Sequence, residues 1–339
     1  MRKHQATIRD VAAAAGVSIT TVSRFMNGHQ RFSADVEAKI NDAIEQLSYR
    51  QNPAARSMAT GRTGAIGLAV LDIRNPHHAN IVKGANRVAL AHGYNVLIVD
   101  MEESAGHEQH LLEALALRVD ALIVSARAPD ATIDWLVSNN KPVSFIGRPS
   151  RTDVASAGSD GYMAALMLGR YLVEQGWTRI AYVGCVSARW NAARLKGLQT
   201  ALAEADIEPV VFNAETTNAE AGERIASAVF LGGNRPEVVV GCNDLVAMGL
   251  MYEAQAMGLR VPDDVAIAGF DNIPACRYVS PALTTVELRS EEMGEAAMNQ
   301  VLGIIAGTVS KVSDIVLEPR LMVRKSACNP KRLTNGDQK

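Results

Sequence analysis

Side chains able to contact DNA bases follow one another near the N-terminus, in the stretch SITTVSRFMNG at residues 18–28. When Val22 and Phe25 face a preceding helix, four side chains remain on the outer side of this segment. An arginine can pair bidentately with guanine, while a hydroxyl or an apolar side chain can contact other base edges. The four outer residues are Ile19, Thr20, Thr21 and Arg24.

Two short helices are needed to hold these side chains in place. Ile8, Val11, Ala12 and Ala15 follow the spacing of one apolar helix face. Gly16 favours the end of that helix, and Ser18 is suited to cap the next one. Such a helix-turn-helix places the first residues of its second helix on base edges in the major groove. The helix pattern alone leaves open a simple αα-hairpin that only packs on another part of the protein.

A third helix is predicted from Ser33 to about Ser48, and it completes a small bundle over residues 1–50. The segment 51–62 then contains Asn52-Pro53, a signal for a helix start, and ends near Gly61. The helical part of this segment would be about seven residues long, which is too short for a stable isolated helix. We therefore expect a linker or a helix that forms only on a partner. The expected bundle core is Ile8, Val11, Val17, Val22, Phe25, Ile40, Ile44 and Leu47.

Charge and composition favour an intracellular, DNA-contacting protein. Residues 1–60 carry eight Lys/Arg and five Asp/Glu, a balance of +3, which leaves −5 for the rest of a chain whose net charge is −2. The chain has no apolar run of about 20 residues and no apolar N-terminal stretch, so we expect neither a membrane span nor secretion, and a cytoplasmic location. The four widely spaced cysteines are expected to be reduced thiols.

From Gly64 onward, apolar runs alternate with helical patterns, which indicates an α/β fold. Two such series predict two doubly wound parallel-sheet lobes, whose strand ends can face one ligand cleft. Residues 329–339 show no periodic pattern and are expected to be a disordered tail. The expected strands are 64–71, 95–100, 120–125, 142–146, 178–184, 209–212, 237–242 and 264–270, with two more near 315 and 321.

Enzyme signatures are missing from the sequence. Gly61, Gly64 and Gly67 lack the spacing of a dinucleotide-binding loop, and no G-x-S-x-G motif occurs. His107 and His110 form an H-x-x-H pattern without an obvious third ligand, which favours a solvated helix face over a metal site. We therefore expect no catalytic residue, metal or cofactor. A two-lobed sugar-binding protein without DNA-binding activity is the second alternative, and residues 7–61 argue against it.

Four blocks of the sequence resemble the lac-repressor/purine-repressor family of bacterial transcription regulators. They are TIRDVAAAAGVSITTVSRFMNG, NPAARSMATGRTGAIG, NDLVAMG with GLRVPDDVAIAGFDN, and SPALTTVE with EPRLMVRKS. The resemblance implies a periplasmic-binding-protein-like effector domain at 63–328 that binds a small molecule between its lobes. Lobe 1 would comprise 63–158 and 290–318, and lobe 2 159–289 and 319–328, with three crossings between them.

The resemblance also implies a repressor that binds a palindromic double-stranded operator as a homodimer, with 51–62 as a hinge helix in the minor groove. A tail without a heptad repeat argues against a coiled-coil tetramer. Whether the protein represses or activates is not readable from these residues, and repression follows the family.

By position, the resemblance assigns three groups of DNA contacts. Ile19 and Thr20 match base-reading positions, although core packing is the alternative for Ile19, and Arg24 matches an arginine that contacts a base or a phosphate. Phosphate contacts match Thr7, Ser18, Thr21, Ser23 and Asn27. In the hinge, Ala55 and Arg56 match groove contacts. Met58 stands where the family usually has leucine, as an apolar wedge between base steps or simply as an anchor of the linker.

Ten positions match the family's effector site, among which Arg194 and Asp271 are the strongest. Trp190 offers a stacking face for a sugar ring or belongs to the lobe core, and Arg148 either binds an anionic group or pairs with Asp160. A purine needs aromatic faces above and below it, and the positions expected to supply them hold His77, His78 and Thr217. This favours a sugar or sugar acid and hence a carbohydrate-utilisation operon. The ten are His77, His78, Ser125, Arg148, Asp160, Trp190, Arg194, Thr217, Asn243 and Asp271.

Overall fold

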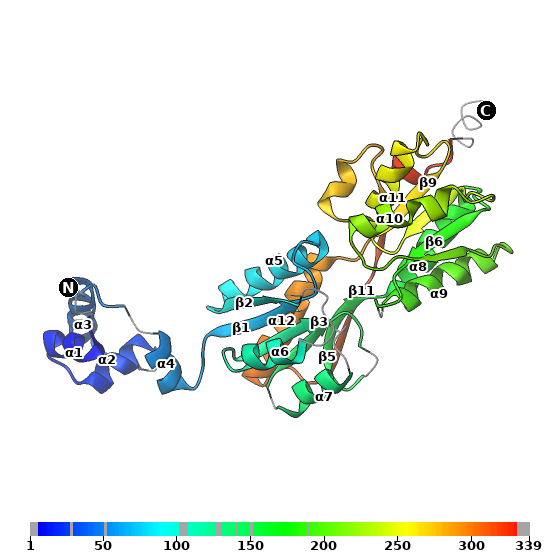
Figure 1. Ribbon diagram of the computed structural model, residues 1–339. Coiled ribbons are helices and arrows are strands. Elements are labelled where there is room, and N and C mark those ends of the chain that lie inside the picture. The colour runs from blue at the N-terminus through cyan, green and yellow to red at the C-terminus, as the bar shows by residue number, and fades with distance from the viewer. Residues whose placement is uncertain are drawn as a thin grey trace, which may run out of the picture. The chain divides into compact units, whose positions relative to one another are not determined.

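The computed structural model divides the chain into two compact units, Met1–Thr63 and Gly64–Lys339 (Figure 1). Within these units the structure describes residues 6–27, 30–50, 53–101, 108–125, 130–139, 141–149, 152–188 and 190–330. In this part of the chain, no helix is both long and apolar enough to cross a membrane. The four cysteines all lie in it and are free thiols, as expected from their spacing.

The first unit is a small helical bundle. Thr7 and Asp10 form a reciprocal capping box at the start of the first helix, and Gly16 ends that helix in the left-handed conformation. Three residues of the expected core, Val11, Val22 and Ile40, are fully buried, and the other five pack around them partly buried. The helices are α1 (Ile8–Ala15), α2 (Ile19–Met26), α3 (Ala34–Gln46) and α4 (Pro53–Thr60).

The segment after the bundle is helical over residues 53–60, which is the helix alternative of the two expected for this stretch. Proline at the first helical position is already set at the helical φ angle, and the Ala, Arg, Ser and Met residues that follow are compatible with a helix. These preferences favour a helix of about two turns, although the segment is shorter than most stable isolated helices.

The second unit begins with a parallel six-stranded sheet in the order β11-β5-β4-β3-β1-β2. One face packs against α5 and α12, through Ala85, Ala89 and Val301 among others, and the opposite face packs against α6 and α7. Its elements are β1 (Ala65–Val70), α5 (Pro76–Ala91), β2 (Asn95–Asp100), α6 (Glu108–Ala116), β3 (Ala121–Ser125), α7 (Asp130–Ser138), β4 (Val143–Ile146), β5 (Ala155–Ser159), α12 (Ser290–Ala306) and β11 (Ser313–Leu317).

A second six-stranded sheet has the order β12-β10-β9-β8-β6-β7. Helices cover it as they cover the first sheet, with Leu168, Leu198 and Leu250 in its core. Its elements are α8 (Gly161–Glu174), β6 (Ile180–Gly184), α9 (Asn191–Ala203), β7 (Val210–Asn213), α10 (Ala219–Phe230), β8 (Val238–Gly241), α11 (Asp244–Ala256), β9 (Ala266–Asp271), β10 (Thr284–Glu287), β12 (Arg320–Met322) and two short 3₁₀ helices, Pro274–Arg277 and Lys325–Ala327.

The chain crosses between the two sheets three times, after β5, after β10 and after β11. Strand β12 is antiparallel to β10, so the expectation of a wholly parallel second sheet is wrong at this edge. The other strands of this sheet end on the side of the lobe where the chain crosses. Strand β12 begins on that side, directly after a crossing, and therefore runs in the opposite direction. The fold extends to Pro330, because Asn329 donates to the Gln175 carbonyl at 2.8 Å. Residues 331–339 of the expected tail, and His107 of the H-x-x-H pattern, lie outside the described residues.

Candidate DNA-binding helices and effector cleft

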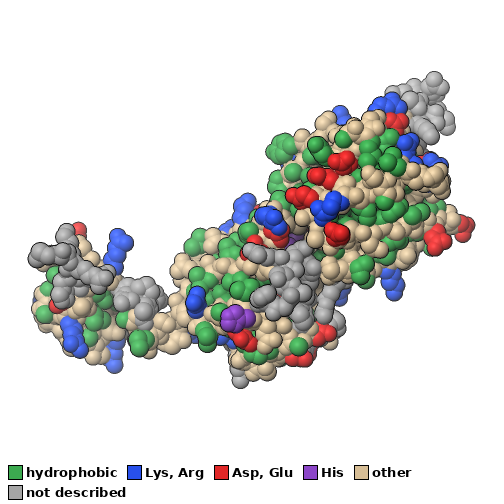
Figure 2. Space-filling view, viewed as in Figure 1, with side chains coloured by type: hydrophobic (Ala, Val, Ile, Leu, Met, Phe, Trp, Pro, Cys, Tyr) green, Lys and Arg blue, Asp and Glu red, His purple; other side chains and the backbone are tan. Residues whose placement is uncertain are grey.

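The outer side of α2 carries the side chains expected to meet DNA. Ile19 is 45% exposed although it is a large apolar residue, so the alternative of core packing is wrong. Thr20 and Arg24 are also exposed, while Val22 is buried and Phe25 packs against the bundle core. Lys and Arg side chains project from this unit, as Figure 2 shows. The helix therefore presents one apolar and two polar side chains outward.

The cap of α2 engages two of the expected phosphate-contacting residues. The Ser18 side chain accepts from the Thr21 amide at 3.0 Å, and the two hydroxyls lie 2.8 Å apart. Ser23 accepts a bond of 3.5 Å from the Asn27 side chain at the other end of the helix, and Thr7 donates to Asp10. These bonds orient all five expected phosphate-contacting groups, at the two ends of α2 and at the start of α1.

In α4, Met58 is 90% exposed, so it packs on nothing in the described part of the first unit. The alternative that it anchors the linker is therefore not supported by any contact there. Ala55 is exposed as well, and the Arg56 side chain lies outside the described residues. An exposed methionine on a short helix is available to an external partner.

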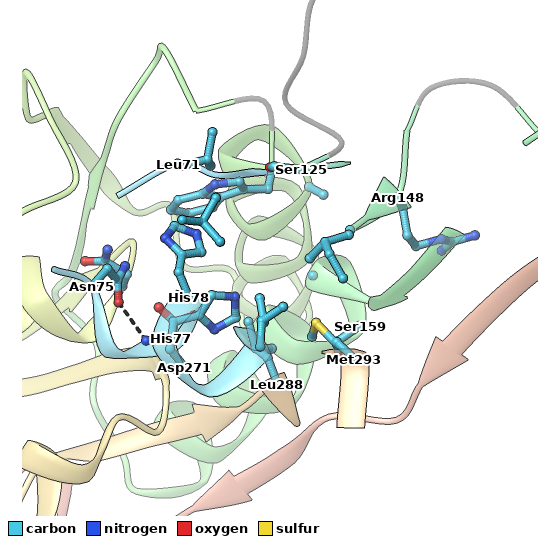
Figure 3. Close-up of a pocket in the computed structure, with 18 of the residues that line it drawn as sticks. Leu71, Asn75, His77, His78, Ser125, Arg148, Ser159, Asp271, Leu288 and Met293 are labelled. Carbon is cyan, nitrogen blue, oxygen red and sulfur yellow. Dashed lines mark hydrogen bonds and ion pairs between the residues drawn. The ribbon is translucent and has the colours of Figure 1, made fainter. Parts of the chain in front are cut away.

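A cavity of about 680 Å³ lies between the two lobes of the second unit (Figure 3). It sits at the carboxyl ends of the strands, where helices α5, α8, α9, α10 and α11 begin. All ten side chains expected at an effector site line it: His77, His78, Ser125, Arg148, Asp160, Trp190, Arg194, Thr217, Asn243 and Asp271. Residues far apart in the sequence thus meet at one place.

Further lining residues were missed by the sequence reasoning. Asn75 caps α5, and Tyr162 lies in the first turn of α8, so both follow strands of the first sheet. Their position after a strand was a usable signal. Leu288 and Met293 reach the cavity from the crossing that leads into α12, and their apolar side chains carry no such signal.

The centre of the cleft is a buried ion pair between Arg194 and Asp271, with 3.3 Å between Nη2 and Oδ1. Arg194 also donates through Nη1 to the carbonyl of Cys242. Its guanidinium carbon lies 4.1 Å from the Trp190 ring centroid and 4.8 Å from that of Phe270. Trp190 packs on the lobe core and also lines the cavity, and its stacking on a sugar ring stays a prediction.

Burial raises the pKa of Asp271, and the neighbouring Arg194 charge opposes that rise. The backbone of Asp271 has a φ of 112° and that of Asn272 a φ of 54°, a region that favours glycine. Non-glycine residues persist there only when their surroundings fix them. The carboxylate is therefore presented from a strained corner at the end of β9.

His77 faces this pair from α5 of the other lobe (Figure 3). Its Nδ1 lies 3.7 Å from Asp271 Oδ1 and has no hydrogen-bond partner in the described structure. Burial and the Arg194 charge lower the pKa of His77 to about 3, so the imidazole is neutral near pH 7 and forms no ion pair. A neutral imidazole offers one donor and one acceptor, which suits a hydroxyl better than an anion.

Two other expected residues are engaged within the protein. Arg148 lies 3.4 Å from Asp160 and 3.6 Å from Asp314, and its side chain is half exposed. The sequence alternative of an Arg148–Asp160 pair is therefore the arrangement in the structure. Asn243 caps α11 through the Val246 amide and donates to the Thr217 carbonyl at 2.8 Å, a bond that fixes two neighbouring loops of the second lobe.

The neutral His77 should make stability depend on pH. As pH falls below about 6.5, His77 becomes protonated in the unfolded chain but stays neutral in the folded protein. The free energy of unfolding therefore decreases progressively from pH 6.5 toward pH 3. One unit below 6.5 corresponds to roughly 1.4 kcal/mol. Between pH 7.5 and 5.5, the free energy of unfolding of His77→Gln should decrease by roughly 1 kcal/mol less than that of the parent. Urea unfolding at the two pH values measures this difference. Parallel losses in the two proteins would contradict the prediction.

Comparisons with known proteins place both units. Residues 7–52 match the family described as bacterial regulatory proteins, lacI family, and residues 170–327 match a periplasmic binding protein-like domain. The chain is 31% identical to the HTH-type transcriptional repressor PurR of Edwardsiella ictaluri (strain 93-146), across 96% of this chain and 97% of that protein. It is 33% identical to PurR of Erwinia tasmaniensis, with the same coverage of both chains.

Solved structures agree with this result. A lac repressor dimer bound to operator and the anti-inducer ONPF has a TM-score of 0.87 and 26% identity, across 96% of this chain and 99% of that chain. A complex of the transcriptional regulator CelR with cellobiose has a TM-score of 0.70 and 26% identity, across 95% and 99% of the two chains. These relatives are transcription regulators and not enzymes, in agreement with the missing enzyme signatures.

Proposed function

Because the chain belongs to the lacI family of bacterial regulatory proteins and is a ligand-responsive transcriptional repressor, we propose that it controls a carbohydrate-utilisation operon. In this proposal, a sugar or sugar acid bound in the interlobe cleft changes the affinity of the repressor for a palindromic operator. A binding protein without DNA-binding activity is not compatible with its helix-turn-helix unit.

The observation that carries the carbohydrate proposal is the Arg194–Asp271 pair facing a neutral His77. Together these groups offer donors and acceptors on both sides of a cavity, as ring hydroxyls require. Trp190 adds an aromatic wall, the usual complement to a few polar groups in small-molecule sites. The structural relative that holds cellobiose supports the same ligand class.

A purine is the second candidate, because the similar repressors from eight bacteria are all named PurR. The described cavity walls do not favour a flat aromatic ligand. The rings of His77 and His78 lie edge to face at 71°, so they form no flat wall. Thr217 offers no aromatic face on its side of the cleft.

At the DNA, we infer that Ile19, Thr20 and Arg24 contact base edges in the major groove. The hinge helix α4 would place Met58 between base steps in the minor groove, next to Ala55 and Arg56. The exposure of Ile19 and Met58 supports these assignments. The phosphate-contacting residues would be Thr7, Ser18, Thr21, Ser23 and Asn27.

A homodimer is proposed because one helix-turn-helix reads only half of a palindrome. The edge strand β2 exposes Leu97 and Ile98, and the edge strand β7 exposes Val210 and Val211. Exposed apolar edge strands favour association with a second chain. The similar lac repressor structure is a dimer. Each protomer would work in the cytoplasm, with the lobe boundaries at 158/159, 289/290 and 318/319.

A thermal-shift screen against neutral sugars, sugar acids and purine bases tests the ligand class. A ligand at 100 times its dissociation constant should stabilise the protein by about 2.7 kcal/mol. We expect a carbohydrate to raise the melting temperature and to change operator binding in a gel shift. Stabilisation by purine bases alone, or by a carbohydrate that leaves operator binding unchanged, would overturn the proposal.

A further inference from the structure

The corner that presents Asp271 is held by the two backbone amides that follow it. The Asn272 amide donates to Thr285 Oγ1 at 3.3 Å, and the Ile273 amide donates to Asp244 Oδ2 at 3.0 Å. Thr285 Oγ1 in turn donates to Asp244 Oδ1 at 2.5 Å. The side chains of Thr285 and Asp244 therefore fix the backbone of residues 272 and 273, directly after Asp271. Positions 271 and 272 are the two with positive φ.

Asp244 is a fully buried carboxylate at the start of α11 and is held from several sides. A third donor, the Cys276 thiol, lies 3.0 Å from Oδ2. A Cβ atom on Gly269 of β9 would lie 2.5 Å from Oδ1, so the carboxylate occupies the space left by that glycine. Its three described partners all donate to its two oxygens.

We propose that Thr285 and Asp244 are positioning residues that hold the Asp271 carboxylate in the orientation needed to bind the effector. Neither side chain is among the described lining of the cavity, so both act through the corner at residues 271–273. The inference rests on the proposed function, because it concerns how the effector site is built. A buried hydrogen-bond relay is a suitable device for this purpose, since it keeps a strained backbone in one conformation.

Thr285→Val removes the hydroxyl that joins Asn272 to Asp244 while keeping the size of the side chain. The probe is the sugar or sugar acid that gives the largest shift in the thermal screen. We expect its affinity to fall at least tenfold in Thr285→Val and to return to within threefold of the parent in Thr285→Ser. The operator affinity of both variants without ligand should stay within threefold of the parent's.

Thr284→Val is the matched control. Thr284 is the neighbouring residue of β10 and equally buried, and its hydroxyl donates to the Arg324 backbone carbonyl at 2.7 Å. In the described structure it makes no direct bond to the 271–273 corner, which Arg324 reaches only through its side chain, by donating to Asn272 Oδ1 at 2.6 Å. Thr284→Val should lower stability but change carbohydrate affinity less than threefold. Equal losses of affinity in the two valine variants, or no loss in either, would overturn the positioning role. If Thr285→Val does not fold, Asp244→Asn replaces it, and at least a threefold loss of affinity is expected.

A ligand-free measurement separates this inference from the proposed function. Asp271→Gly relieves the positive-φ strain at position 271. The factor by which Thr285→Val changes the unfolding equilibrium constant should therefore be at least five times smaller in the Asp271→Gly background than in the parent. Thr284→Val should have the same effect in both backgrounds. Additive effects of Thr285→Val and Asp271→Gly would overturn the inference. Failure of the carbohydrate screen would overturn the proposed function and leave this cycle unaffected.

Discussion

Asp271→Ala should yield a repressor that still binds its operator and no longer responds to effector. The substitution removes the carboxylate that faces the cavity and leaves the Arg194 guanidinium buried without its ionic partner. Breaking a buried pair in this way typically costs about 3–5 kcal/mol of folding stability. Truncating one partner of a buried, hydrogen-bonded charge pair at a binding interface typically costs about 2–5 kcal/mol of binding free energy. We expect effector affinity to fall at least 100-fold, because 1.4 kcal/mol corresponds to a factor of ten.

The measurement is a pair of gel shifts, with and without the carbohydrate identified by thermal shift. Asp263→Ala is a suitable control, since Asp263 lies in the same lobe, is exposed, and pairs only weakly with Arg260 at 3.7 Å. That control should keep the parent response. Asp271→Asn should retain part of the affinity, because an amide oxygen still accepts from Arg194. Normal release of the operator by effector in Asp271→Ala would remove Asp271 from the site.

The sequence predicted most helices and buried strands because their apolar residues follow a clear period. Strand β5 was missed, since its sequence ASAGS has none of the branched or aromatic residues typical of strands. It forms because β4 and β11 flank it and supply both of its hydrogen-bonded edges. The antiparallel direction of β12 was also not readable, because it depends on where the chain re-enters the second lobe.

The candidate site was predictable where a residue matches a family position and lies at a strand end, as Asp271 does. Its supporting contacts were not. The bond between Thr285 and Asp244 joins residues 41 positions apart, and no local pattern indicates it. The neutral state of His77 likewise follows from burial against the opposite lobe, which a single sequence does not reveal. Long-range contacts therefore decide the chemistry of side chains whose positions the family resemblance supplied.

Arg24→Ala should weaken binding to the specific operator far more than binding to random DNA. Arg24 is exposed on α2, and its described contact is a bond of 3.4 Å to Gln30, so it can turn toward a base. A bidentate arginine–guanine contact contributes about 1–3 kcal/mol of discrimination. We expect a loss of roughly 5- to 150-fold on the operator and less than threefold on a scrambled duplex, measured by gel shift at one salt concentration.

The salt dependence of binding distinguishes a base contact from a phosphate contact. Each DNA phosphate that the protein neutralises makes the plot of log affinity against log salt concentration steeper by about 0.9. If Arg24 reads a base, Arg24→Ala should leave that slope unchanged while operator affinity falls. Lys39→Ala is the control, because Lys39 is exposed on α3, pairs with Asp35 of the same helix, and is not assigned to DNA. Equal losses on both duplexes with a smaller slope would make Arg24 a phosphate contact, and sequence reading would then rest on Ile19 and Thr20.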